Sequence, residues 1–235
     1  MNDFNNAIRY NEGINTNSVM TKVFSKMFLG LIVTALAAYF TFATGAFIYI
    51  VRNPILEFGI AILEVALVIY LSVRVVKMSK GQANFWFYTY AVLNGITMSY
   101  IFAAYTQSTI FLAFLCSAAM FGCTAVFGAI TKKDLSTVGT VGVMLLIGIT
   151  ITTLLNMLIF KSTGINLFLL YAGLVLFAGI TAYDIQNIKN LSNQVEGQSE
   201  NLVNTVATLG ALEIYLDFIN IFVRLLAIIG NRSDN

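Results

Sequence analysis

Seven apolar segments, each about 20 residues long or longer, follow one another along this 235-residue chain. An α-helix of that length crosses the hydrocarbon core of a lipid bilayer. Charged residues make up only 10% of the chain, against about 25% in soluble domains, and the mean hydropathy is +0.83. These features exclude a soluble globule and predict an all-α integral membrane protein with seven transmembrane helices.

The predicted helices span residues 23–50, 55–76, 84–105, 109–130, 137–160, 165–188 and 208–229. Only the connecting segment 189–207 is long and polar, and we expect it to form a loop between the last two helices, with helical extensions as an open alternative. We therefore expect a polar cytoplasmic N-terminal tail (1–22), a seven-helix transmembrane domain (23–230) and a polar C-terminal tail (231–235). The first tail has no apolar core or cleavage site, so we expect no cleavable signal peptide.

The basic residues predict the orientation of the chain. In this topology nine lysine and arginine residues lie on the side of the N-terminus and four on the other side. Because basic residues concentrate on the cytoplasmic side, the N-terminus is predicted to be cytoplasmic. The short chain, with no long cytoplasmic domain, suggests the bacterial plasma membrane, with a eukaryotic endomembrane as the alternative.

The composition also excludes several kinds of chemistry. The chain has no histidine, which removes the usual zinc ligand and the usual partner of a catalytic serine. Its net charge of +2, without a basic cluster rich in aromatics, speaks against nucleic-acid binding. Cys116 and Cys123 are seven residues apart on one predicted helix, about 10 Å, which is too far for a disulfide. We expect no enzymatic activity and no cofactor.

Two aspartates interrupt the last two apolar segments. Asp184 lies in "LFAGITAYDIQNIKN", and Asp217 lies in "LEIYLDFINIFVRLLAIIG". An ionised group at the bilayer centre costs at least about 2.5–3.5 kcal/mol, so such residues usually face the interior of a helix bundle. The predicted topology places both aspartates, and Arg74 at the end of the second helix, toward the cytoplasmic side at similar depth.

Other polar residues recur along the helices. The last helix carries a polar stripe at spacings of four, three and four: Glu213, Asp217, Asn220 and Arg224. Because the other faces of this helix are apolar, protein or water must lie opposite the stripe. Glu57 and Glu64 share a face of the second helix. We predict that a cation path is lined by Glu64, Glu57, Glu213 and Asn220.

Uncharged polar and small residues predict packing rather than chemistry. Asn94 with Thr97, and Thr153 with Asn156, are expected to form interhelical hydrogen bonds. Small residues on the fourth helix are expected to allow close approach of a neighbouring backbone. They are Ala118, Gly122, Ala125 and Ala129.

A close pair of aspartates has a chemical consequence. Two carboxylates about 4 Å apart repel by about 4 kcal/mol at an effective dielectric of about 20. The pair would therefore retain one proton toward neutral pH and titrate as a unit. Arg74 could instead stabilise one ionised carboxylate, which gives two discrete states. Carboxylates also bind hard cations, so the residues predict a cation path with a proton-linked gate, for calcium, protons or sodium.

The segments "GITAYDIQNIKN" and "LEIYLDFINIFVRLLAI" resemble the two C-terminal signature segments of the transmembrane Bax inhibitor motif family, in the form of its bacterial members. The resemblance implies a seven-helix fold with the C-terminal helix at the centre. It also implies a pH-sensitive calcium leak that is gated by the paired aspartates Asp184 and Asp217, with calcium as the permeant ion. Arg74 corresponds to the latching arginine and Glu64 to the acidic residue of the second helix.

Two other classes of function stay open. Paired acids also serve proton-coupled secondary transporters, and a non-conducting membrane regulator would act through protein partners. An intramembrane aspartyl protease is disfavoured, because "IYL" precedes Asp217 where that class has Gly-x-Gly, and the only proline is Pro54. We expect the bilayer, calcium ions and protons as partners and leave protein partners open, a monomer included.

Overall fold

The computed structural model describes residues 16–195 and 197–233, and every regular element in them is helical. The long helices are α2 (Thr16–Ala43), α4 (Pro54–Arg74), α5 (Lys80–Met98), α7 (Gln107–Ile130), α8 (Ser136–Leu155), α9 (Thr163–Gln194) and α10 (Glu200–Ser233). Short elements are α3 (Ala46–Arg52), η1 (Val75–Lys77), α6 (Ile101–Ala104) and a π-helical turn, η2 (Asn156–Phe160). Most of the expected N-terminal tail and part of the C-terminal tail lie outside the described residues.

The chain divides into two compact units. The first contains the described residues up to Ala104 together with Ile188–Tyr215. The second contains Tyr105–Asn187 and the described residues from Leu216 onward. The helices α9 and α10 therefore contribute to both units.

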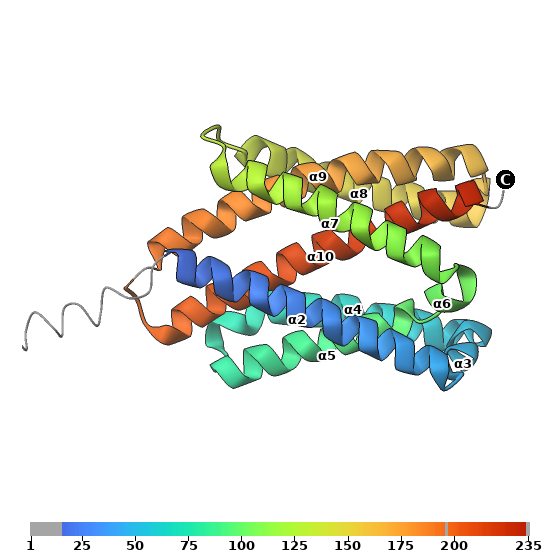
Figure 1. Cartoon of the computed structure of the whole chain (residues 1–235), viewed down its shortest axis with the longest axis horizontal. Helices are drawn as coiled ribbons and strands as arrows, with labels where there is room; N and C mark the ends of the chain where they lie inside the picture. The colour runs from blue at the N-terminus through green and yellow to red at the C-terminus, as the bar shows by residue number, and fades with distance from the viewer. Residues whose placement is uncertain (1–15, 196, 234–235) are drawn as a thin grey trace, which may run out of the picture. The chain divides into compact units, whose positions relative to one another are not determined.

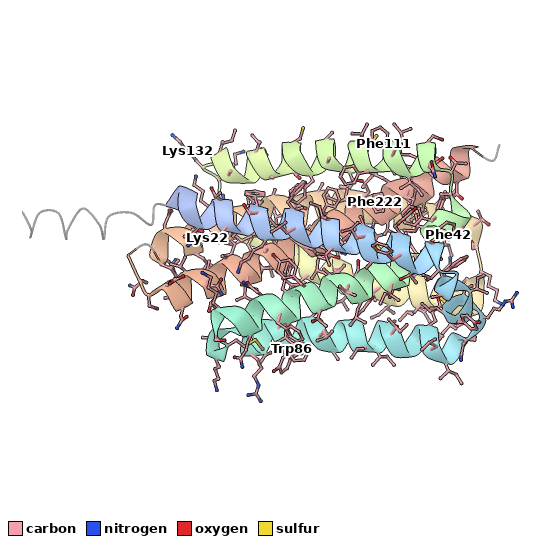
Figure 2. The ribbon with its side chains drawn as sticks, turned by 60° about the horizontal axis from the view of Figure 1, so that its bottom comes forward. Lys22, Phe42, Trp86, Phe111, Lys132 and Phe222 are labelled. Atoms are coloured by element: carbon pink, nitrogen blue, oxygen red, sulfur yellow. The ribbon has the colours of Figure 1, made fainter. Side chains whose placement is uncertain are left out.

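In the first unit, α2 and α4 both pack against α5 (Figure 1). Lys22 and Phe42 lie toward opposite ends of α2 (Figure 2). The helices α2 and α5 approach closely at Gly95, where an added Cβ would collide with the backbone carbonyl of Thr34. Phe87 of α5 packs in the interior of this unit, where its ring centre lies 5.9 Å from that of Tyr215 of α10.

In the second unit, α7 and α8 pack against α9 through glycines. A Cβ at Gly128 of α7 would meet the backbone of Ala182, and one at Gly139 of α8 would meet the ring of Tyr183. The packed face of α7 therefore lies about one residue away from the face that the small residues predicted. Nothing lies within 4 Å of a Cβ placed at Gly122, and the buried small residues are Ala113, Ser117, Ala125 and Gly128.

Five helices in the described part of the chain are long and apolar enough to cross a membrane: Val19–Ala43, Pro54–Lys77, Gln107–Ile130, Ser136–Phe160 and Thr163–Gln194. Their outer faces carry large exposed apolar side chains, such as Ile62 at 68% and Val175 at 73% exposure. A soluble protein rarely exposes such continuous apolar surface. The all-helical membrane prediction is confirmed, but the count of seven spans is not, because α5 and α10 carry more polar residues.

Several predicted helix ends were wrong. The expected loop 189–207 is largely helical, since α9 continues to Gln194 and α10 begins at Glu200. These extensions form because Val195, Val203 and Val206 bury their side chains with Val19. The first predicted helix breaks before residue 50, where Gly45 adopts a left-handed conformation (φ 74°) that favours glycine.

Candidate functional site

The second unit is organised around the antiparallel pairing of α9 with the end of α10. Arg224 of α10 lies over the ring of Phe177 of α9. Asp184 of α9 and Asp217 of α10 form a second contact between these helices. Asp184 follows Phe177 by seven residues, and Asp217 precedes Arg224 by seven residues. Seven residues are about two turns of a helix, so both pairs lie on the same faces of the two helices.

The structure brings Asp184 and Asp217 into hydrogen-bonding contact. An ionised carboxylate can only accept hydrogen bonds, so a bond between two carboxyl groups requires a proton on one of them. The Asp217 side chain is only 3% exposed, and Asp184 is half-buried. The arrangement is thus a buried acid pair that can hold one proton.

Buried apolar residues adjoin the pair on both helices. Ile185, next to Asp184, is fully buried. Phe218, next to Asp217, packs between Phe114 and Phe121 of α7, with a distance of 5.7 Å between ring centres in both pairs. Removing water in this way strengthens electrostatic interactions within the pair.

Gln186 was not recognised in the sequence as a site residue. Its side-chain amide donates to the carbonyl oxygen of Lys133 (2.8 Å) and accepts from the backbone N–H of Leu135 (2.9 Å). It therefore ties the connection between α7 and α8 to α9, two residues after Asp184. A glutamine at the predicted inner end of a membrane helix, on the same side as a short polar loop, was the available signal.

Arg224 belongs to the predicted polar stripe and lies against protein. Its guanidinium carbon is 5.2 Å from the centre of the Phe177 ring, and Nη1 donates to the carbonyl oxygen of Leu169 (3.2 Å). A Cβ at Gly173 would occupy the position of the guanidinium group. Asn220 instead donates to the carbonyl oxygen of Leu216 in its own helix (2.9 Å).

The predicted acidic path residues of α4 are separated. Glu64 is half-buried and accepts a hydrogen bond from Thr97 of α5 (2.6 Å). Glu57 is exposed in the first turn of α4, about 10 Å away along the helix. Glu213 lies half-buried on α10 in the first unit. Glu57 and Glu64 therefore lie apart along α4, and a path lined by these acids stays a prediction.

The expected interhelical hydrogen bonds are present for one pair and not for the other. Thr97 binds Glu64, and Asn94 accepts from the hydroxyl of Tyr215 (3.1 Å). Thr153 donates within its own helix, to Ile149. Asn156 bonds to Ser162, where it closes the turn after α8. The second pair therefore satisfies local backbone groups rather than joining helices.

The hydroxyl of Tyr215 joins three helices of the first unit, a role that its place in an apolar sequence segment does not predict. This hydroxyl lies 2.6 Å from that of Thr34, which also donates to the carbonyl oxygen of Ala91 (2.9 Å). With the bond to Asn94, the network links α2, α5 and α10. Its members are buried, so it fixes these helices by satisfied polar contacts.

The remaining predicted site residues keep their status as predictions. Arg74 ends α4 in the first unit and is exposed, whereas the aspartate pair belongs to the second unit. The latch therefore stays a prediction.

Within residues 16–195 and 197–233, no group of three histidine, cysteine or acidic residues is placed to hold a metal ion. Transient calcium binding at the pair also stays a prediction, and Cys116 and Cys123 are free thiols.

The helices and the buried acid pair define a class, the polytopic membrane proteins with ionisable groups inside the membrane. A family model described as "Inhibitor of apoptosis-promoting Bax1" matches residues 16–234. The chain belongs to this Bax inhibitor family.

Bacterial relatives cover nearly the whole chain. It is 38% identical over 214 residues to the "Inner membrane protein YbhL" of Escherichia coli K12, covering 91% of each chain. It is 36% identical over 220 residues to an uncharacterized protein of Borreliella burgdorferi, covering 93% of this chain and 94% of the relative. It is 33% identical over 238 residues to an uncharacterized membrane protein of Streptococcus pyogenes serotype M3, covering all of both.

Proposed function

We propose that this protein is a pH-sensitive calcium leak of the membrane, gated by Asp184 and Asp217. The observation that carries the proposal is the hydrogen bond between these two carboxyl groups, which joins α9 to α10. Asp184 lies in α9, a helix that is long and apolar enough to cross a membrane. The bond requires one proton, so its existence depends on pH. When that proton leaves, two adjacent carboxylates repel each other, so the contact is lost and one carboxylate becomes available to another partner.

The proton-linked change would have two states. In the protonated state the aspartates share one proton and do not need a basic partner. In the deprotonated state one carboxylate takes Arg74 as its partner, which latches the closed form. Calcium would be the permeant ion, because carboxylate oxygens are its preferred protein ligands. Glu64, Glu57, Glu213 and Asn220 remain candidates for the path by which the ion reaches the gate.

The proposal includes seven spans, with α5 and α10 as the two additional ones. The polar residues of α5 point into protein: Asn94 and Tyr90 are buried, and Thr97 binds Glu64. A polar side chain that is satisfied inside the bundle does not prevent a helix from crossing. Buried residues follow one another along most of α10, which supports a central position for this helix.

The relatives support the membrane that we propose, and the charges support the proposed orientation. A relative of 38% identity is named an inner membrane protein in Escherichia coli, which supports the bacterial plasma membrane for this chain. With seven spans, the nine basic residues on the N-terminal side against four on the other favour a cytoplasmic N-terminus.

The test is calcium entry into proteoliposomes that contain the purified protein, measured across about pH 6 to 8. We expect a protein-dependent flux whose pH dependence disappears in Asp184→Asn and in Asp217→Asn. Asparagine keeps the size of the side chain and removes its titration. Asp134→Asn is the matched control, because Asp134 is an exposed acid that belongs neither to the pair nor to the proposed ion path.

Two outcomes would contradict the proposal. An unchanged pH profile in both aspartate variants would exclude the pair as the pH sensor. Absence of flux above that of empty liposomes would exclude the leak and favour the proton-coupled transporter or the non-conducting regulator. Size-exclusion profiles of the variants show whether each one remains folded.

A further inference from the structure

One end of the first unit gathers three lysines and one glutamate. Lys22 and Lys26 lie one turn apart on α2, Lys80 is the first residue of α5, and Glu200 is the first residue of α10. Lys80 Nζ lies 2.9 Å from Glu200 Oε1. Lys22 and Lys80 both lie close enough to Lys26 to repel its charge. Three positive charges therefore meet one negative charge.

Lys26 is the unusual member of this group because it is half-buried and bonds only to neutral oxygens. Its Nζ donates to Asn204 Oδ1 (2.8 Å) and to Thr208 Oγ1 (2.6 Å), both on α10. An ammonium group has three N–H donors, so two neutral contacts leave one donor for a further acceptor. A partly buried cation is stabilised much more by an anion than by neutral groups.

The position of the lysines relative to the bilayer indicates the source of that anion. The apolar span of α2 begins at Val19, so Lys22 and Lys26 lie within about its first two turns. This is the depth of the lipid headgroups, and a lysine side chain can extend several ångströms toward them. Lys22 and Lys80 are exposed and can reach the same ligand.

We infer that Lys22, Lys26 and Lys80 form a binding site for the phosphate group of an anionic membrane lipid. The headgroup phosphate would take the free donor of Lys26 and lie between the exposed ammonium groups of Lys22 and Lys80. The N-terminus of α5, which a Ser79–Gln82 capping box closes, adds a favourable dipole for a negative charge. Glu200 competes with the lipid for Lys80.

The test is the binding of phosphatidylglycerol to the purified full-length protein by native mass spectrometry, beside phosphatidylcholine and inorganic phosphate. We expect tighter binding of phosphatidylglycerol than of phosphatidylcholine. Lys22→Gln with Lys80→Gln should weaken phosphatidylglycerol binding about 30-fold, from two lysines near the membrane surface. Lys132→Gln with Lys133→Gln removes the same charge from the connection between α7 and α8, and should leave this binding unchanged.

A second variant is expected to change lipid binding in the opposite direction, so the site can be tested even if a lysine variant does not fold. Glu200→Gln removes the competing acid, so phosphatidylglycerol should bind more tightly. Equal weakening by the Lys132 and Lys133 control would overturn the site in favour of general charge attraction. Equal binding of phosphatidylcholine would overturn the need for an anionic lipid, and inorganic phosphate binding of the same strength would overturn a lipid as the ligand.

Discussion

Arg224 lies over the ring of Phe177, with 5.2 Å from its guanidinium carbon to the ring centre, two helical turns from the contact between Asp184 and Asp217. A cation on an aromatic face stabilises a partly desolvated site by about 0.5–2 kcal/mol. The same two helices therefore hold an acid pair at one level and a cation at another. The Arg224–Phe177 contact therefore contributes to the register of α10 against α9, the same register in which the two carboxyl groups meet.

This relationship predicts the effect of a single methyl group at Gly173. Gly173→Ala places Cβ where the Arg224 guanidinium group lies, and the flexible arginine must leave the Phe177 ring. We expect a loss of about 1 kcal/mol in the free energy of unfolding, seen as a lower thermal midpoint in detergent. Gly148→Ala of α8 is the control, because nothing lies within 4 Å of its Cβ. Equal midpoints for the two variants would remove the role of Arg224 in this register.

Close packing of α7 on α9 gives a second prediction. Gly128→Ala would push Cβ into the backbone of Ala182, which cannot move like a side chain. We expect a loss of about 1–3 kcal/mol in the free energy of unfolding. Gly122→Ala on the same helix meets nothing within 4 Å and should be neutral or slightly stabilising. A thermal unfolding series in detergent measures both, and a reversed order would place the packed face of α7 where the sequence predicted it.

The two glycines of α7 show where sequence-based prediction succeeds and where it fails. Apolar length identified most of the membrane helices, and the cost of a charge in lipid singled out Asp184 and Asp217, because both effects depend on local composition. Which face of α7 touches α9 depends on a partner more than 50 residues away. Helices with apolar residues all round carry little signal for that choice, so Gly122 was preferred to Gly128.

The same reasoning explains the missed tyrosine and the extent of the helices within segment 189–207. Tyr215 looks like one more aromatic residue of an apolar helix, and its importance comes from Thr34 and Asn94 on other helices. The segment 189–207 is polar enough for a loop, but isolated valines within it bury against Val19 and extend both helices. Tertiary contacts decided these positions against local polarity.

The network around Tyr215 predicts a cost for removing one oxygen atom. Tyr215→Phe leaves the buried Asn94 side chain without its donor and the Thr34 hydroxyl without its partner on α10. We expect a loss of about 1–2 kcal/mol in the free energy of unfolding. Tyr49→Phe is the control, since Tyr49 is 77% exposed. Equal thermal midpoints for these two variants would mean that the network does not hold the helices.

The ion pair between Glu200 and Lys80 predicts a pH dependence of stability. The hydrogen bond and the charge of Lys80 lower the pKa of the Glu200 carboxyl below its ordinary value of 4.5. A lowered pKa in the folded protein stabilises it above about pH 4.5, and this stabilisation is lost as the pH falls through the folded-state pKa. Wild type should therefore exceed Glu200→Gln in thermal midpoint near pH 6, by a small amount because the pair is exposed. Near pH 3 the difference should shrink, and a constant difference would exclude this titration as its cause.

The latch gives the last prediction, and it concerns Arg74 at the end of α4. If an arginine–carboxylate bond holds the closed form at high pH, Arg74→Ala removes a charge-assisted hydrogen bond of about 1.5–3 kcal/mol. Calcium flux at pH 8 should then rise about tenfold, toward the flux at pH 6, where the aspartates share a proton. Lys77→Ala removes a basic residue three positions further on and should leave the flux unchanged. If Arg74→Ala gave the wild-type flux at both pH values, Arg74 would have no part in the gate, and the pH response would have to come from the Asp184–Asp217 pair without this latch.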